Sequence, residues 1–186
     1  MATEWSRTLQ ALEREKTNLT RFEVHFFDES NFKKFMEEIE QILTMYEHIC
    51  LAGYFSEAMT QAIFKVYPGI KPNIRVLSPR LGKTQRDQDN LKALRKLADK
   101  GIIVRVHSRL HCRMFLAYTI NPKGDISGSL ILGSFDFNNE GMLMTKRNAG
   151  IFTYHPDLVK SAITYYNEIF AEPRDSMSLE EMYPEK

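Results

Sequence analysis

Hydrophobic side chains recur along the chain at two different spacings. Between Ser30 and His48 they return every three or four residues, opposite a face of Lys, Glu and Gln, which predicts an amphipathic helix. Further helices are expected over Ser56 to Val66, Gln88 to Lys100 and Asp157 to Ala171. Gly101 stands where a glycine commonly ends a helix. The helical spacing therefore predicts a helix at each of these places.

Segments rich in β-branched and aromatic residues separate the helices. The run from Ile49 to Phe55 is largely apolar, as expected of a strand that is buried on both faces of a sheet. Strands that first alternate with helices and then follow one another directly predict an α/β fold with a mixed sheet flanked by helices. The expected strands are Phe22–Phe27, Ile49–Phe55, Asn73–Leu77, Ile102–Val106, His111–Tyr118, Ser129–Phe137 and Asn148–Tyr154.

The length of 186 residues suits one ordinary domain. We expect a helical arm over residues 1–21, the domain over residues 22–172, and a loosely held tail over residues 173–186. No apolar run approaches the roughly 20 residues of a membrane span, and the N-terminus lacks the apolar core of a secretory signal. Cys50 and Cys112 lie in apolar runs and are expected to be reduced core residues. These features favour a cytoplasmic protein without a membrane partner.

Charge is distributed unevenly although the net charge is only +1. Between Lys71 and Arg113 the Lys and Arg residues exceed the acids to give +9, and the remainder of the chain carries −8. A basic block of this kind suits an anionic partner, phosphate above all, because each neutralised phosphate releases counterions. A solvated helix face with arginines fringing the strands explains the same distribution, and both interpretations stay open.

Two of the expected strands carry residues that can act on a phosphate. In a strand that begins at His111, the side chains of His111 and Arg113 share one face, because strand side chains alternate. Ser134 and Asp136 share a face of the next strand in the same way, and Gly133 allows a close approach of backbone or ligand. A nucleophile, a cation, a hydroxyl and a carboxylate are therefore expected at two neighbouring strand ends.

These residues resemble the motif of the phospholipase D superfamily, whose pattern is H-x-K, a spacer, G-S-x-N, and a strand bearing Asn or Glu. Here the corresponding stretches are HCR, the turn NPKGD, LILGSFDFNNEG and RNAGIF. The stretch AGYFS and the helix before GIIVRV are also similar to one half of that fold. The resemblance covers residues 22 to 170, and it implies a phospholipase D-like half that pairs with a second subunit.

The resemblance also implies roles for the motif residues. His111 would be the nucleophile that forms a phosphohistidine, and Arg113 and Ser134 would hold non-bridging oxygens, with Asp136 in the place of the family's asparagine. The reaction also requires an acid for the leaving group, and one histidine cannot attack and donate at once. The resemblance therefore implies a homodimer in which His111 of each subunit meets across a two-fold axis. The scheme requires no metal and no other cofactor.

Three departures from the family pattern bear on activity. Arg113 replaces lysine, and Asp136 replaces asparagine and so places a negative charge where an anionic substrate would arrive. A carboxylate that often orients the histidine is absent from its usual places, where this chain has Lys146 to Asn148 on the last strand and Tyr118 after the motif. Under one hypothesis Asp136 or Glu140 supplies that carboxylate. Under the other, the site binds phosphate and does not cleave it.

The sequence therefore favours a metal-independent phosphodiesterase, a nuclease in particular, with a catalytically silent module that binds nucleic acid or phosphate as the alternative. Nucleic acid is favoured over lipid because of the basic block and the lack of a membrane-seeking segment, which leaves a phosphatidyl transferase in third place. Metal binding by His107, His111 and Asp136 and a Ser134 hydrolase match no recognised spacing. For His107 a role in capping the preceding strand is the stronger alternative. Candidate substrate contacts are Lys83, Arg86, His107, Arg109, Asn138, Glu140, Lys146 and Arg147.

Overall fold

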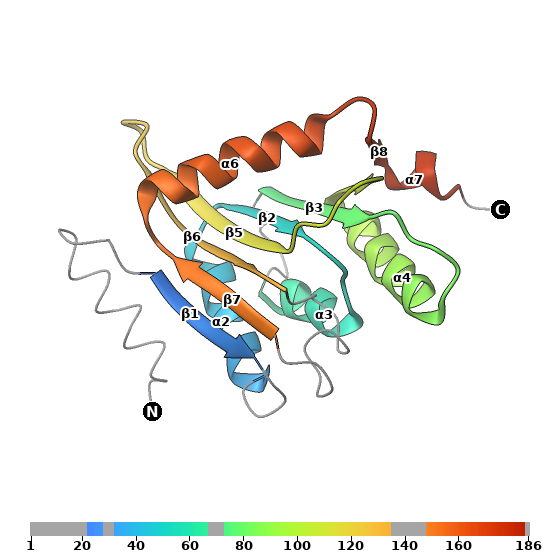
Figure 1. The fold of residues 1–186 in the computed structure, drawn as a ribbon, viewed down its shortest axis with the longest axis horizontal. Helices are drawn as coiled ribbons and strands as arrows, with labels where there is room; N and C mark the ends of the chain where they lie inside the picture. Colours follow the sequence, from blue (N-terminus) through green and yellow to red (C-terminus); the bar gives the residue numbers. More distant parts are fainter. Residues whose placement is uncertain (1–21, 28–31, 67–72, 135–147, 185–186) are drawn as a thin grey trace.

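The strands form one mixed sheet with helices on both faces (Figure 1), so the predicted α/β architecture is confirmed. The computed structural model describes residues 22–27, 32–66, 73–134 and 148–184. The strands in these ranges are β1 Phe22–Phe27, β2 His48–Ala52, β3 Asn73–Pro79, β4 Ile103–His107, β5 Met114–Ile120, β6 Ile126–Gly133, β7 Asn148–Thr153 and β8 Ser176–Ser178. The helices are α2 Phe32–Met45, α3 Glu57–Val66, α4 Gln85–Asp99, α6 Pro156–Ala171 and α7 Leu179–Met182.

The direction of the strands changes in the middle of the sheet, whose order is β1-β7-β6-β5-β2-β3-β4-β8. The strands β2, β3 and β4 run parallel, whereas every other neighbouring pair is antiparallel. The carboxyl ends of β2, β3 and β4 therefore meet the start of β5 at one edge. Because Leu132 pairs with Met114 and Gly133 with Gly150, the end of β6 and the start of β7 lie there too. We call this the carboxyl edge.

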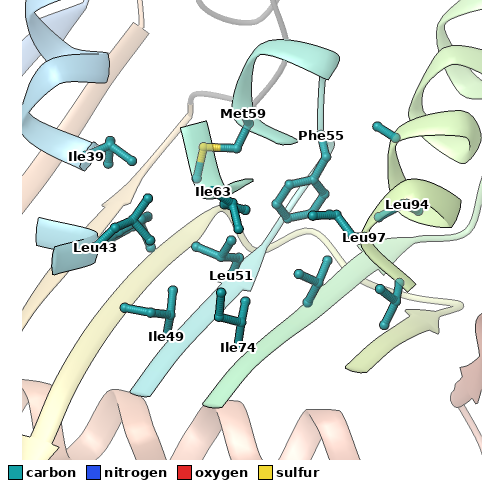
Figure 2. Close-up of a cluster of buried hydrophobic side chains, with 14 of the residues drawn as sticks. Ile39, Leu43, Ile49, Leu51, Phe55, Met59, Ile63, Ile74, Leu94 and Leu97 are labelled. Atoms are coloured by element: carbon teal, nitrogen blue, oxygen red, sulfur yellow. The ribbon is translucent and has the colours of Figure 1, made fainter. Parts of the chain in front are cut away.

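The helices α2, α3 and α4 cover one face of the sheet. Their apolar stripes meet the inward side chains of β2 and β3, and Figure 2 shows this layer from Ile39 and Leu43 of α2 to Leu94 and Leu97 of α4. Ile39, Leu43, Leu94 and Leu97 have no exposed surface. Full burial of such a side chain contributes roughly 1.5–3 kcal/mol relative to exposure, which explains why the pattern in the sequence predicted these helices well.

On the opposite face, α6 packs over β5 and β6 (Figure 1). Its Tyr166 is fully buried, and the hydroxyl lies 2.9 Å from the Arg75 carbonyl oxygen and 3.2 Å from the Leu51 carbonyl oxygen. The Arg75 guanidinium donates to Asn167 Oδ1 at 2.7 Å and to the Cys50 sulfur at 3.2 Å. Burial raises the pKa of the Cys50 thiol, so Cys50 stays protonated as a reduced core residue.

The end of the chain is better held than the sequence predicts. The strand β8 pairs with β4, and α7 begins with a capping box between Ser178 and Glu181. Tyr183 accepts a hydrogen bond from the Leu81 backbone N–H, and its hydroxyl donates to the Leu81 carbonyl at 3.2 Å. The expectation of a loosely held tail is therefore wrong as far as residue 184. The expected arm over residues 1–21 lies outside the described residues.

No helix in the described ranges is both long enough and apolar enough to cross a membrane.

Gly128 of β6 allows the close contact between the sheet and α6. A Cβ atom at this position would lie 2.5 Å from the Ala117 carbonyl oxygen and 2.9 Å from Val159 Cγ1, and both neighbours are buried. We therefore expect Gly128→Ala to lower the free energy of unfolding by about 1–3 kcal/mol, measured by urea denaturation. Ser127→Ala, at an exposed position of the same strand, should change it by less than about 0.5 kcal/mol. Equal effects of the two changes would contradict the close packing of α6.

Candidate functional site

The connection between β4 and β5 runs along the carboxyl edge. Since β3 and β2 lie between these two strands, residues 108–113 must cross the ends of both, a distance of about 14 Å at the usual strand spacing. The strand that the sequence predicted from His111 begins instead at Met114. The reason is that β2, the partner of β5, ends at Ala52, and Gly53 turns the chain away with φ of 147°. His111 and Arg113 therefore lie in the connection.

His111 is exposed between two anchored neighbours. Leu110 before it is buried in the core under α6, and Cys112 after it is half-buried against the same core. Burial raises the pKa of the Cys112 thiol, an effect that the nearby Arg113 charge opposes. No described residue makes a hydrogen bond with the His111 ring. The histidine is thus presented to solvent at the carboxyl edge, where a substrate can reach it.

One aromatic ring gathers two guanidinium groups at this edge. The Arg113 Cζ atom lies 5.2 Å from the centre of the Tyr54 ring, and the Arg86 Cζ atom lies 4.5 Å from it. Tyr54 follows β2, and Arg86 lies in the first turn of α4, so three separate elements meet here. Both contacts are within the range of cation–π attraction. Tyr54 carried no signal in the sequence, because it belongs to an apolar run that is typical of a buried strand.

Ser134 lies at the same edge, directly after β6. Its Oγ accepts a hydrogen bond from the Ala149 N–H at 3.2 Å, and its own N–H donates to the Ala149 carbonyl at 3.0 Å. The preceding residue, Gly133, donates its N–H to the Arg113 carbonyl at 3.3 Å. Ser134 is thereby attached to β7, and it directly follows Gly133, which is hydrogen-bonded to the connection that carries His111. The structure thus brings His111, Arg113 and Ser134 to one edge.

The start of α4 adds basic charge beside them. Thr84 caps the helix, and the Asp87 carboxylate accepts hydrogen bonds from the Thr84 N–H at 3.2 Å and the Thr84 hydroxyl at 2.7 Å. This capping box sets the helix directly after the carboxyl end of β3. Lys83 is exposed just before the cap, and Arg86 reaches the Tyr54 ring. Two of the predicted substrate contacts therefore lie at the carboxyl edge.

His107 and Arg109 are engaged within the fold. The Arg109 backbone N–H donates to His107 Nδ1 at 3.2 Å, so the ring carries its hydrogen on Nε2 and donates to Glu172 Oε2 at 2.9 Å. The Arg109 guanidinium forms ion pairs with Glu172 at 3.4 Å and with Asp175. His107 is the last residue of β4, and its ring is buried there. A contact of either residue with a substrate stays a prediction.

The remaining positions of the motif add no further group to the carboxyl edge within the described residues. Tyr118, where many family members carry an aspartate, is buried at the far end of β5 and stacks on His48 with ring centres 4.8 Å apart. This position therefore lies away from the carboxyl edge, and its tyrosine supplies no carboxylate there. Within the described ranges, no group of three or more His, Cys, Asp or Glu side chains could hold a metal ion. The other predicted residues, which are Asp136, Asn138, Glu140, Lys146 and Arg147, lie outside the described residues.

No protein-family model matches the sequence, and no curated protein matches it. Solved structures do match the fold. Nuc from Salmonella typhimurium, a phospholipase D family member, is 15% identical with a TM-score of 0.58, and the match covers 83% of this chain and 97% of Nuc.

Two further structures are similar. Polyphosphate kinase from Porphyromonas gingivalis is 14% identical with a TM-score of 0.63, over 89% of this chain and 29% of the kinase. TrmBL2, an archaeal chromatin protein with a novel mode of DNA binding, is 14% identical with a TM-score of 0.54, over 94% of this chain and 60% of TrmBL2. Likeness at this level of identity defines the fold. The chain therefore has the phospholipase D-like fold that its motif predicted.

The Tyr54 ring should support anion binding by holding Arg86 and Arg113 side by side. We expect Tyr54→Leu to weaken binding of inorganic phosphate about fivefold or more, since each cation–π contact contributes roughly 0.5–1 kcal/mol. The affinity is measured from the phosphate-dependent rise of the thermal unfolding midpoint at constant ionic strength. Tyr54→Phe keeps the ring and should bind as the wild type does. Equal losses in the two variants would show that the ring is not what aligns the guanidinium groups.

Proposed function

We propose that the chain is a phosphodiesterase that cleaves nucleic acid through His111 at the carboxyl edge. One observation carries this proposal above the others. The β4–β5 connection holds an exposed histidine beside Arg113 and Ser134, in the fold of a family whose motif has a histidine, a cation and a serine in this order. The same edge gathers Arg86 and Lys83, so a substrate phosphate would meet positive charge from two elements.

The reaction follows from these groups. Arg113, Arg86 and the Ser134 hydroxyl bind the non-bridging oxygens and stabilise the charge that grows on them as the phosphorus is attacked. A neutral His111 nitrogen forms a bond to phosphorus while the bond to the leaving oxygen breaks, and that oxygen takes a proton from a second imidazole. Water then attacks the phosphohistidine, gives a proton back to the second imidazole, and releases His111.

The second imidazole is His111 of the partner subunit in a homodimer. Two arguments support this assignment. The sequence carries the motif from HCR to LILGSFDFNNEG once, and the match covers 97% of Nuc, so each chain offers one such motif. Of the other histidines whose side chains the structure describes, His107 is buried against Glu172, His48 stacks on Tyr118 at the far end of β5, and His155 occupies the N-cap position of α6. A two-fold axis at the carboxyl edge would bring His111 of the partner subunit into the site as the acid.

The choice of nucleic acid rests on charge. The segment from Lys71 to Arg113 carries +9, and it includes Lys83, Arg86 and Arg113 at the carboxyl edge. A polyanion that extends beyond the cleaved phosphate would use more of this charge than a small phosphodiester would. TrmBL2, which shares the fold, is a chromatin protein that binds DNA.

The central test is cleavage in EDTA of single- and double-stranded DNA and RNA and of bis(p-nitrophenyl) phosphate. We expect metal-independent activity in the wild type and a loss of about a thousandfold or more in His111→Ala, because the variant cannot form the phosphohistidine. His48→Gln changes a remote histidine and should keep the activity. Cleavage that requires a divalent metal, or that survives in His111→Ala, would contradict the proposed chemistry.

Subunit mixing tests the shared site. When wild-type and His111→Ala subunits are unfolded together and refolded in varied ratios, activity should fall as the square of the wild-type fraction, because each reaction requires two intact histidines. The mass of the refolded protein, measured by light scattering, checks that dimers are present in every mixture. A linear fall would show that one subunit carries out the reaction alone.

A catalytically silent binding module is the second candidate, and one observation favours it. The guanidinium of Arg113, which stands where the family has lysine, already lies over the Tyr54 ring. A group held in this way can bind phosphate tightly without following the movement of the reacting atoms. Salt-dependent binding of nucleic acid by a wild-type dimer that cleaves none of the substrates would identify this function.

A further inference from the structure

The connection that carries His111 is fastened to the chain segment that follows α6. Ser108 donates its backbone N–H to the Asp175 carbonyl at 2.9 Å, and its hydroxyl donates to the Asp175 carboxylate. The Arg109 guanidinium forms ion pairs with the carboxylates of both Asp175 and Glu172. We call residues 172–175 the α6–β8 connection. It contacts the β4–β5 connection at two successive residues.

Glu172 also secures the residue at the base of the connection. Its Oε2 accepts the Nε2 hydrogen of His107 at 2.9 Å, while His107 Nδ1 accepts the Arg109 N–H. The side chain of His107 is 7% exposed, whereas that of Glu172 is 35% exposed, so the histidine half of the pair is shielded from water. The hydrogen bonds to Ser108 and Arg109 lower the pKa of the Asp175 carboxyl, which therefore stays ionised at neutral pH.

His111 also has fixed neighbours directly before and after it. Leu110 is buried, Cys112 is half-buried, and Arg113 lies over the Tyr54 ring. Such anchoring matters because the β4–β5 connection crosses two strand ends with no ladder of its own. An exposed segment without these contacts would sample many conformations, and an imidazole displaced by about 1 Å loses much of its reactivity.

From this arrangement we propose that Glu172 and Asp175 are positioning residues that hold the β4–β5 connection, so that His111 is presented in one place. The proposal rests on the proposed function for the role of His111, but the anchoring itself can be measured separately. Neither carboxylate touches the substrate. Both act through His107, Ser108 and Arg109.

The two carboxylates are not what attaches the end of the chain. The strand β8 is hydrogen-bonded to β4, and Arg105 Nε donates to Ser176 Oγ at 2.8 Å. Tyr183 is bonded to Leu81 further along. The side chains of Glu172 and Asp175, by contrast, contact residues 107–109. Neutralising them should therefore loosen the β4–β5 connection and leave the rest of the fold in place.

Cys112 reports this loosening without any need for activity. We expect Glu172→Gln and Asp175→Asn to raise the rate at which N-ethylmaleimide labels Cys112 by about two- to fivefold each, the change that follows from losing a partly exposed ion pair. Cys50, which is fully buried, is the reference for global unfolding, and mass spectrometry separates the two sites. Glu180→Gln, at an exposed acid of α7, is the matched control and should label as the wild type does.

A double-variant cycle and kinetics complete the test. Asp175→Asn and Arg109→Gln together should raise the labelling rate of Cys112 by less than the product of the two single effects, because both changes remove the Arg109–Asp175 ion pair. In cleavage assays Asp175→Asn and Glu172→Gln should lower kcat about threefold or more and change KM less than twofold, whereas Glu180→Gln should change neither.

The outcomes separate the two proposals. Faster labelling of Cys112 in a protein whose wild type cleaves nothing would refute the proposed function and support the anchoring. Cleavage that is active in the wild type and unchanged in both acid variants, with unchanged labelling, would overturn the positioning role. Equal increases at Cys112 and Cys50 would also overturn it, because they would mean that the whole fold has been destabilised.

Discussion

The pairing of β2 decides the arrangement of the rest of the molecule. On one side β2 runs parallel to β3, and on the other it runs antiparallel to β5. Parallel neighbours require crossover connections, and the helices of these connections cover one face of the sheet, whereas the antiparallel pair β5 and β6 is joined by residues 121–125 alone. The change of direction sends the β4–β5 connection across the ends of β3 and β2. Because of this crossing, a histidine and an arginine close in sequence lie at the edge where the β6 end also lies.

Arginine in place of lysine makes physical sense in this setting. A lysine ammonium is a point charge, whereas the planar guanidinium of Arg113 can lie over the Tyr54 ring and still direct N–H groups toward an anion. Arg86 uses the same ring from the start of α4. Arg113, Tyr54 and Arg86 are therefore best understood together. The Tyr54 ring brings two arginines of the basic block, Arg86 and Arg113, to the same place.

The elements that the sequence predicted well are those whose signal is local. The helix α2 follows from its apolar stripe, and the confirmed strand β2 follows from a short apolar run. The end of α4 at a glycine is confirmed as well, since Gly101 has φ of 79°. The start of β5 was wrong because strand ends depend on where a partner strand stops, and the partner β2 is more than 60 residues away in the chain. The predicted loosely held tail was wrong because its main contacts, to β4 and Leu81, are also distant in sequence.

The sequence by itself determined the class of fold and the motif residues His111, Arg113 and Ser134, because apolar periodicity and a short ordered motif are properties of neighbouring residues. Only the tertiary structure decided that Tyr54 joins Arg86 to Arg113, and that Glu172 and Asp175 hold the connection that carries His111. These contacts join residues that are 32 to 67 positions apart, and nothing in the local sequence encodes such a pairing. They depend on strand order, which the packing of the whole sheet selects.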